Sequence, residues 1–351
     1  MSDATPRTEI GNLGEFGLIK RLAEKITITQ PTTLKGVGDD AAVLAKRDKL
    51  TVVTTDMLVE GVHFDLMYVP LKHLGYKSIV VNLSDVCAMN AVPTQVTVAI
   101  ALSNRFSVEA VEELYEGMRA ACKRYNVDLV GGDTTTSLKG LIISVTAIGE
   151  VEDGKQVYRS TANEGDLICV TGDLGGAYLG LQILEREKRI FLENPEIKPD
   201  LENQQYIIGR QLKPEARIDI VKWFAENDVL PTSMIDISDG LSSEALHLCE
   251  QSNLGCIINE ADIPISDEAK NQAFKFELDP TMCALSGGED YELLFTIRPE
   301  DLEHTKGSLD ITVIGEMTSK DSAAVMLSKG GNKHKLIAQG WNAFGNQKTS
   351  E

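Results

Sequence analysis

Residues 72–89 read KHLGYKSIVVNLSDVCAM, and this stretch decides much of the fold. Its apolar residues occupy most sides of a helix instead of one stripe, which predicts a buried helix over Lys72–Met89. Asp85 stands inside this helix. Because an unpaired carboxylate on a buried helix costs several kcal/mol, Asp85 is expected to hold a partner, and a metal ion is the natural one.

The flanking segments mix strands and helices. In the first half the pattern predicts a helix from the N-cap Ser107 through Tyr125, a helix at Gly14–Ile26, and strands at Leu50–Thr55, Gln95–Ser103, Val127–Gly131 and Leu141–Val151. After the polar stretch 152–166 it predicts strands at Leu167–Thr171, Cys256–Glu260, Tyr291–Arg298, Ile311–Met317 and Ala323–Leu327, and helices near Gly176–Arg186, Pro214–Asn227 and Leu241–Ser252.

The order of these elements does not follow a strict β-α-β alternation. This favours two α+β domains, an N-terminal one over 1–151 and a C-terminal one over 152–351, rather than a doubly wound parallel sheet. The charged segment Glu187–Gln205 lacks a clear period and is expected to be a surface excursion.

The net charge of the chain argues against two classes of binding partner. The 351 residues carry 34 Lys and Arg against 53 Asp and Glu, a formal net charge of -19. Such a surface repels phosphate backbones and anionic lipid, so neither nucleic acid nor a membrane is expected as a partner. No stretch has the ~18 apolar residues of a membrane span, and no leader pattern is seen, so the cytoplasm is the expected location. The six cysteines form no C-x-x-C pair and are expected to be reduced and buried.

Acidic residues gather in short motifs at glycine turns, at strand ends and in the buried helix. They are Gly36-Val-Gly-Asp-Asp40, Thr54-Thr-Asp56, Asn82-Leu-Ser-Asp85, Gly131-Gly-Asp-Thr-Thr135, Asp236-Ile-Ser-Asp-Gly240 and Ser286-Gly-Gly-Glu-Asp290. Any single one is typical of a turn or cap. Two carboxylates ~4 Å apart repel by about 4 kcal/mol even near a surface, so a shared cleft of acids needs protons or cations. Oxygen-only ligands with hydroxyls beside them suit Mg²⁺.

The motifs combine acidic residues with glycines and contain no cluster of Lys or Arg that could neutralise a polyphosphate. This indicates that Mg²⁺ binds the polyphosphate of a nucleotide, and it predicts a phosphoryl-transfer reaction. The common ATP motifs G-x-x-x-x-G-K-[ST], H-R-D and D-F-G are absent. Gly36-x-Gly38-x-x-Ala41 imitates a dinucleotide fingerprint, but Asp39 and Asp40 would face the pyrophosphate. Asp236-Ile-Ser-Asp-Gly240 does not match an EF-hand loop, because its glycine is at the fifth position and not at the sixth. The sequence also contains no G-x-S-x-G motif, which argues against a serine hydrolase.

Read in order, these motifs resemble the thiamine-monophosphate kinase family of the aminoimidazole-ribonucleotide-synthetase-like superfamily. The resemblance also rests on Gly14-Glu-Phe, Gly61-Val-His63-Phe, Lys77 and Arg159-Ser, and it runs from about Gly14 to Phe344. It implies ATP-dependent phosphorylation of thiamine monophosphate to thiamine diphosphate by direct in-line transfer, with no catalytic side chain. It also implies the superfamily's two α+β domains and a homodimer built through the N-terminal sheets.

The resemblance further implies roles for single residues. The implied Mg²⁺ ligands are Asp40, Thr54, Thr55, Asp56, Asp85, Asp133, Asp236 and Asp239. The implied ATP contacts are Tyr115, Gly132, Asp133, Arg159 and Ser238, and the implied contacts of thiamine monophosphate are His63, Glu289 and Trp341.

Plainer roles stay open for several of these residues. His63 is also compatible with a satisfied core histidine, Trp341 and Tyr115 with packing, and Arg159 with a cap on the linker. Asp39 and Asp290 are interpreted as supporting or turn acids. Two other functions stay open as well: a related ATP-dependent ligase such as the purine-pathway cyclo-ligase, and a regulator that binds Mg-ATP without turnover.

Overall fold

The computed structural model describes Thr8, Asn12, Leu18 and residues 21–35, 42–45, 48–305 and 310–338. The chain divides into two compact units. The first comprises Met1–Gln156, Leu184–Asp200 and Leu212–Asp228, and the second comprises Val157–Ile183, Leu201–Gln211 and Val229–Glu351. The first division lies within the predicted polar stretch. Two later segments, Leu184–Asp200 and Leu212–Asp228, also belong to the first unit. This assignment depends on tertiary contacts, which the local sequence pattern does not predict.

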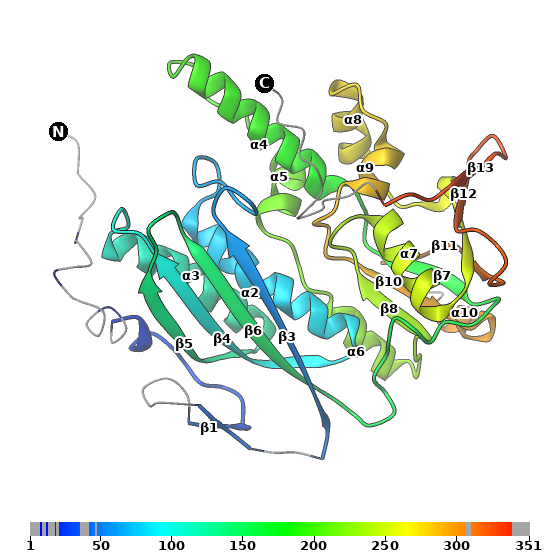
Figure 1. The fold of residues 1–351 in the computed structure, drawn as a ribbon, viewed down its shortest axis with the longest axis horizontal. Helices are drawn as coiled ribbons and strands as arrows, with labels where there is room; N and C mark the ends of the chain where they lie inside the picture. The colour runs from blue at the N-terminus through cyan, green and yellow to red at the C-terminus, as the bar shows by residue number, and fades with distance from the viewer. Residues whose placement is uncertain are drawn as a thin grey trace. The chain divides into compact units, whose positions relative to one another are not determined.

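The first unit is built on a four-stranded sheet in the order β3-β6-β4-β5 (Figure 1). Its strands are β3 (Leu50–Val59), β6 (Ile142–Val151), β4 (Val92–Leu102) and β5 (Asp128–Thr136). β4 and β5 are parallel and the other pairs are antiparallel. Across the sheet Asp56 stands opposite Val145, Val145 opposite Val98, and Val98 opposite Gly132. A two-stranded pair, β1 (Thr33–Lys35) and β2 (Val43–Leu44), also belongs to this unit.

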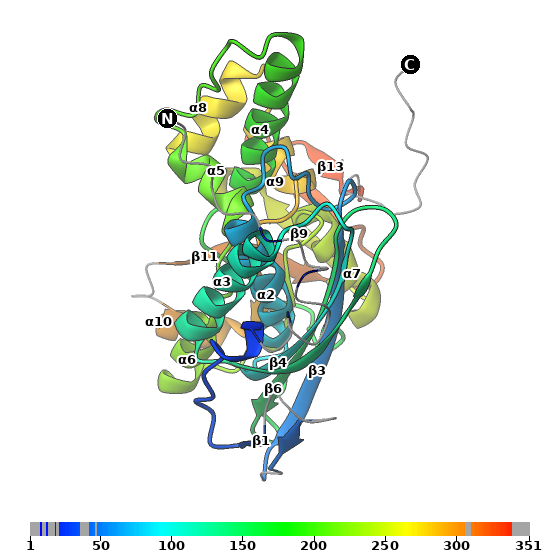
Figure 2. The ribbon, with the colours of Figure 1, turned by 90° about the vertical axis from the view of Figure 1, so that its left-hand side faces the viewer.

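Helices α2 (Leu71–Ala88) and α3 (Val108–Tyr125) cover one face of this sheet, as Figures 1 and 2 both show. Fourteen of the 18 residues of α2 are buried, which confirms the predicted buried helix. α3 begins after Ser107, whose hydroxyl accepts the Ala110 N–H at 3.3 Å, so the predicted N-cap is confirmed. A shorter helix, α6 (Ile218–Glu226), packs against α2.

The other face of the sheet carries exposed apolar side chains. Residues alternate between the faces of a strand, so Val53 and Met57 of β3 point away from the helices. They are 62% and 55% exposed. This face of the sheet therefore carries two large apolar side chains that the described residues leave exposed.

The second unit is a seven-stranded sheet in the order β13-β12-β9-β11-β7-β10-β8. Its strands are β7 (Leu167–Thr171), β8 (Ser233–Asp236), β9 (Gly255–Asn259), β10 (Leu293–Ile297), β11 (Ile311–Thr318), β12 (Val325–Leu327) and β13 (Lys333–Lys335). β12 and β9 are parallel, whereas the other neighbours are antiparallel. The mixture of sheet and helix in both units confirms the predicted α+β class.

The helices of the second unit enclose two apolar cores. One core lies between the sheet and α7 (Leu241–Ser252) and includes Ile168, Ile235 and Leu241. The other joins the start of α4 (Gly176–Glu193) to α5 (Gln205–Leu212), α8 (Asp267–Lys275) and α9 (Pro280–Ser286). Short helical segments η1 (Glu260–Asp262), η2 (Pro299–Asp301) and α10 (Leu302–Thr305) complete the unit.

Several elements differ from the sequence expectation. β8, α5, α8, α9 and β13 were not predicted, because each has nine residues or fewer and therefore a weak period. α4 runs on to Glu193, and Glu187 is only 6% exposed while its carboxylate accepts the Asp200 N–H at 2.9 Å. The expectation of a pure surface excursion was therefore wrong at its start. All six cysteines are buried and free, as expected. In the part of the chain that is described, no helix is both long and apolar enough to cross a membrane.

Candidate functional site

An acidic pair lies at the contact between β3 and α2 in the first unit. Thr54 Oγ1 donates to Asp85 Oδ2 at 2.7 Å, and the Asp56 N–H donates to Asn82 Oδ1 at 2.9 Å. Asn82 and Asp85 are one helical turn apart and therefore face the same strand. Burial, and then the negative charge of Asp85, raise the pKa of Asp56 to about 6. The buried-helix aspartate thus has a hydroxyl partner and a second carboxylate as its neighbour.

Thr55 points to the opposite face of the sheet from Thr54. Its hydroxyl donates to Val145 O at 3.0 Å and accepts from Thr146 Oγ1 at 3.1 Å. This is the alternation that an extended strand dictates. The predicted ligands Thr54 and Thr55 are therefore adjacent in sequence but separated by the thickness of the sheet.

His63 lies in the turn that follows β3. The Val59 N–H donates to His63 Nδ1 at 3.1 Å, so the proton of the neutral ring belongs on Nε2. The ring is half-buried. This bond gives His63 a structural role in its turn, and it orients the ring at the same time.

Three of the predicted nucleotide contacts line one cavity of about 100 Å³ at the β5 end of the sheet. They are Tyr115, Gly132 and Asp133, and the cavity is otherwise lined by Leu22, Ala23, Ile26, Val98, Leu129, Gly131 and Thr134. Burial raises the pKa of Tyr115 to about 12, so its ring is neutral. A Cβ at Gly132 would lie 1.8 Å from Val98 O, which explains why glycine stands there. The result is an apolar slot with a backbone and a carboxylate at its rim.

The acidic pair and this slot lie at opposite ends of the sheet. β3 and β5 are the two edge strands of this four-stranded sheet. Asp56 on β3 and Gly132 on β5 are three strand spacings apart, which is roughly 14 Å. The structure therefore brings Asp56 and Asp85 together but leaves Asp133 apart from them. Asp40 lies outside the described residues.

The fit of these residues to Mg²⁺ can be judged from their donor atoms. Carboxylates and hydroxyls are the oxygen ligands that Mg²⁺ prefers, and the raised pKa of Asp56 marks charge that a cation would relieve. Among the described residues, however, no group of three or more His, Cys, Asp or Glu side chains is arranged to hold a metal ion. The donor chemistry of Asp56, Asp85 and Thr54 fits Mg²⁺.

In the second unit the turn Asp236–Gly240 joins β8 to α7. Asp236 is buried, whereas Ser238 and Asp239 are half-buried. Glu244, in the first turn of α7, folds back so that its Oε1 accepts the Asp239 N–H at 2.9 Å and the Ser238 hydroxyl at 3.5 Å. Burial, reinforced by the charges of Asp239 and Asp236, raises the pKa of Glu244 to about 8. Burial raises the pKa of Asp239 as well.

The acceptor motif at Ser286–Asp290 is hydrogen-bonded directly to this turn. The Glu289 N–H donates to Ser238 O at 2.7 Å, and the Tyr291 N–H donates to Ile237 O at 2.9 Å. The predicted nucleotide residue Ser238 and the predicted acceptor residue Glu289 are thus neighbours in the fold. Gln211 Nε2 in turn donates to Glu289 Oε2 at 2.6 Å.

Asp290 and Arg159 take structural positions. The buried Asp290 carboxylate accepts the Gly175 N–H at 2.8 Å and the Ala177 N–H at 3.3 Å at the start of α4, and burial raises its pKa to about 7. Its interpretation as a turn acid agrees with this position. Arg159 is exposed, and its backbone oxygen accepts the hydroxyls of Ser233 and Ser252 at 3.0 and 3.1 Å. Trp341 lies outside the described residues.

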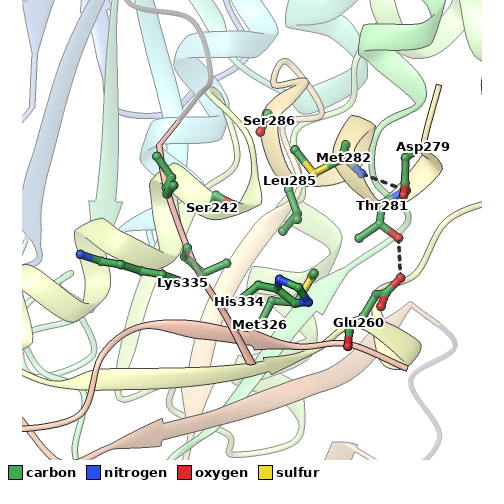
Figure 3. Close-up of a pocket in the computed structure, with 13 residues that line it drawn as sticks. Ser242, Glu260, Asp279, Thr281, Met282, Leu285, Ser286, Met326, His334 and Lys335 are labelled. Atoms are coloured by element: carbon green, nitrogen blue, oxygen red, sulfur yellow. Dashed lines mark hydrogen bonds between the residues drawn. The ribbon is translucent and has the colours of Figure 1, made fainter. Parts of the chain in front are cut away.

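A cavity of about 380 Å³ lies in the second unit between α7, α9, β12 and the residues after β13 (Figure 3). Its acids already serve the fold: Glu260 accepts the Thr281 hydroxyl at 3.3 Å, and Asp279 caps α9 by accepting the Thr281 N–H at 2.7 Å. Ser286 connects this cavity to the acceptor motif, whereas Glu289 does not line it.

Sequence reasoning gave no role to three residues that touch the site, namely Asn82, Glu244 and Gln211. Asn82 was visible in the motif, one turn before Asp85 on the same helix. Glu244 follows the Asp236–Gly240 turn within one helical turn, a spacing from which a side chain can fold back on the backbone. Gln211 carries no local signal, because its contact with Glu289 spans 78 positions.

Comparison with known proteins places the chain in a family. Family models of AIR synthase related proteins match it, the N-terminal domain over residues 38–151 and the C-terminal domain over residues 163–328. It is 33% identical to a thiamine-monophosphate kinase of Bacillus subtilis, over 95% of this chain and 100% of that protein. It is 36% identical to the one of Aquifex aeolicus, over 95% of this chain and 98% of that protein.

Comparison with solved structures gives matches to the same family. The structure described as AaThiL complexed with AMPPCP and TMP superposes with a TM-score of 0.72 at 34% identity, covering 98% of this chain and 100% of that one. A thiamine-monophosphate kinase from Stenotrophomonas maltophilia gives 0.75 at 32% identity, covering 90% of this chain and 97% of that one. The hydrogenase maturation protein HypE in complex with ATP gives 0.70 at 18% identity, covering 91% and 94%, which supports the fold alone.

The two α+β units have the architecture of AIR synthase related proteins. Within that class, the full-length identity above 30% shows that the chain belongs to the thiamine-monophosphate kinase family.

Proposed function

We propose that this protein transfers the γ-phosphoryl group of ATP to the phosphate of thiamine monophosphate, giving thiamine diphosphate and ADP. The main support for this proposal is the structural match over nearly the whole chain to AaThiL, whose structure is described as a complex with AMPPCP and TMP. The motifs that would contact such ligands are all present in this chain.

The transfer is proposed to be direct, with no phosphoenzyme. The acceptor is a phosphate that is already ionised near neutral pH, so the reaction needs no base to generate its nucleophile. The chain is proposed to supply positioning contacts: Tyr115 and Gly132 of the first unit contact ATP, and in the second unit Ser238 contacts ATP and Glu289 contacts thiamine monophosphate. Arg159 is the proposed cation on the nucleotide.

Several Mg²⁺ ions are proposed to be held by the eight predicted ligands, namely Asp40, Thr54, Thr55, Asp56, Asp85, Asp133, Asp236 and Asp239. When bound, the ions would neutralise the polyphosphate charge. Without them the acids would repel the nucleotide, because the chain already carries a net charge of -19.

A homodimer through the N-terminal sheets is part of the proposal, and two observations support it. The open sheet face exposes Val53 and Met57, which a second copy would cover. Asp56 and Asp133 also lie on the two edge strands of one sheet, roughly 14 Å apart, which supports a site that draws these two acids from different copies. We further propose a cytoplasmic location, since all six cysteines lie in the described part and are free thiols.

The test is a coupled assay of ADP release with and without thiamine monophosphate, combined with direct detection of thiamine diphosphate. We expect ADP release to depend on thiamine monophosphate and on Mg²⁺. Turnover of formylglycinamidine ribonucleotide instead would identify a cyclo-ligase. Tight Mg-ATP binding with no transfer would identify a regulator.

The same assay separates the two substrate sites. Arg159→Ala should mainly raise KM for ATP, whereas Glu289→Gln should mainly raise KM for thiamine monophosphate. Equal effects of both variants on both constants would count against separate contacts.

A further inference from the structure

The loop that carries Glu289 adopts a backbone that side chains normally avoid. Gly288, Glu289 and Tyr291 have φ values of 71°, 59° and 53°. Residues other than glycine enter this left-handed region only when their surroundings hold them there. A Cβ at Gly288 would also lie 2.5 Å from Ser238 O. The conformation is therefore imposed by contacts and not chosen by the local sequence.

Arg210 of helix α5 makes some of the contacts that hold this loop in its conformation. Its Nη1 donates to Glu292 Oε1 at 2.9 Å, and its Nη2 donates to the backbone oxygens of Asp173 at 2.9 Å and Asp290 at 3.3 Å. One planar guanidinium thus ties the strand end before α4 to Asp290 and Glu292, which follow Glu289 in the chain. The backbone of the Glu289 loop is consequently anchored to α5.

The next residue of α5 reaches the side chain of Glu289 itself. Gln211 is 5% exposed, and its Nε2 donates to Glu289 Oε2 at 2.6 Å. A free glutamate has three rotatable bonds and loses that freedom when it binds a ligand. A carboxylate already held by a buried amide loses less of it, which favours binding.

We propose that Gln211 is a positioning residue of the acceptor site: it holds the Glu289 carboxylate toward the cationic or amino-bearing organic part of the acceptor. The inference rests on the proposed function for the identity of that acceptor. It adds a residue that lies outside every motif from which the family resemblance was drawn.

The experiment compares wild type with Gln211→Met, which keeps the length and removes the amide. We expect the acceptor Kd and KM to rise by up to about tenfold, because the Glu289 side chain must then be ordered when the acceptor binds. The ATP constant and kcat should stay within about twofold, because the proposed role of Gln211 is exerted through Glu289. Gln272→Met is the matched control, since Gln272 is a buried glutamine of the same unit in α8. It should leave every constant unchanged.

A double variant shows whether Gln211 acts through Glu289. In a Glu289→Ala background, Gln211→Met should no longer raise the acceptor constants. A further rise in that background, or a loss of kcat with unchanged acceptor constants, would overturn the proposal. If Gln211→Met does not fold, Gln211→Asn, whose shorter stem withdraws the amide, is measured with the same expectation.

Calorimetric binding of thiamine monophosphate keeps the two proposals distinguishable. A wild type that binds it without phosphorylating it contradicts the proposed function, yet Gln211 is still tested through Kd. A wild type that does not bind it overturns both. Binding and turnover in wild type with no change in Gln211→Met overturn the positioning role alone.

Discussion

Asp56 holds its proton to a higher pH than an ordinary aspartate, because burial and the charge of Asp85 raise its pKa to about 6. A cation bound there must displace that proton, so the apparent affinity for Mg²⁺ should fall as the pH drops through 6. Mg²⁺ titrations of activity between pH 5 and 8 measure this. The Asp85→Asn protein should bind Mg²⁺ more weakly at pH 8 and show a smaller change with pH. An affinity constant over this range would contradict the assignment of Asp56 as a ligand.

Glu244 makes a second residue-level prediction. Burial raises its pKa from 4.5 to about 8 in the folded protein, so the unfolded chain releases this proton first. Stability of the metal-free protein should therefore fall as the pH rises from 4.5 to 8. Glu244→Gln should raise Tm at pH 8 and leave it nearly unchanged at pH 5, measured in the presence of a chelator. Glu250→Gln, on an exposed position of α7, is the control. A Tm that drops at pH 8 would show that the charged form is the stable one.

Among the elements, α3 offers a clean test, since its start was predicted from Ser107 and is found there. Removing the cap hydroxyl leaves the Ala110 N–H without this acceptor. Ser107→Ala should lower Tm by about 2–4 °C, the size expected for about 1 kcal/mol. Ser107→Asp should restore it, because aspartate is an equally good cap. Calorimetry of the three proteins decides, and an unchanged Tm in Ser107→Ala would mean that the cap contributes nothing.

Other elements show how far local patterns reach. β7 and α7 begin and end where the sequence predicts, because a continuous apolar strand and an amphipathic helix carry their own period. α5 has eight residues and β8 has four, which is too short for a period to be read. These two elements nevertheless carry Arg210, Gln211 and Asp236.

At the scale of the whole molecule, the proposed dimer predicts complementation. Asp56→Asn and Asp133→Asn should each be inactive alone. When the two proteins are unfolded and refolded together, half of the dimers are mixed, and each mixed dimer has one site with both acids. Activity should then return to about a quarter of wild type. Analytical ultracentrifugation of each sample measures whether it is dimeric. No recovery from a mixed dimer would show that each site uses both acids of one chain.

The sequence alone determined the class of fold, the buried helix with its aspartate and the cap at Ser107, and its acidic motifs predict Mg²⁺ and a nucleotide. These depend on short-range periods and on residue chemistry, which are visible within a few positions. The family resemblance added roles for single residues, of which Asp40 and Trp341 lie outside the described structure.

Only the tertiary structure decided which of these residues are neighbours. Strand order puts Asp56 and Asp133 at opposite ends of a sheet, and alternation puts Thr54 and Thr55 on opposite faces. Backbone bonds place Ser238 beside Glu289, and α5 brings Gln211 to the same carboxylate across 78 positions. The physical reason is that such contacts depend on how strands pair and helices pack, which short-range sequence patterns do not encode.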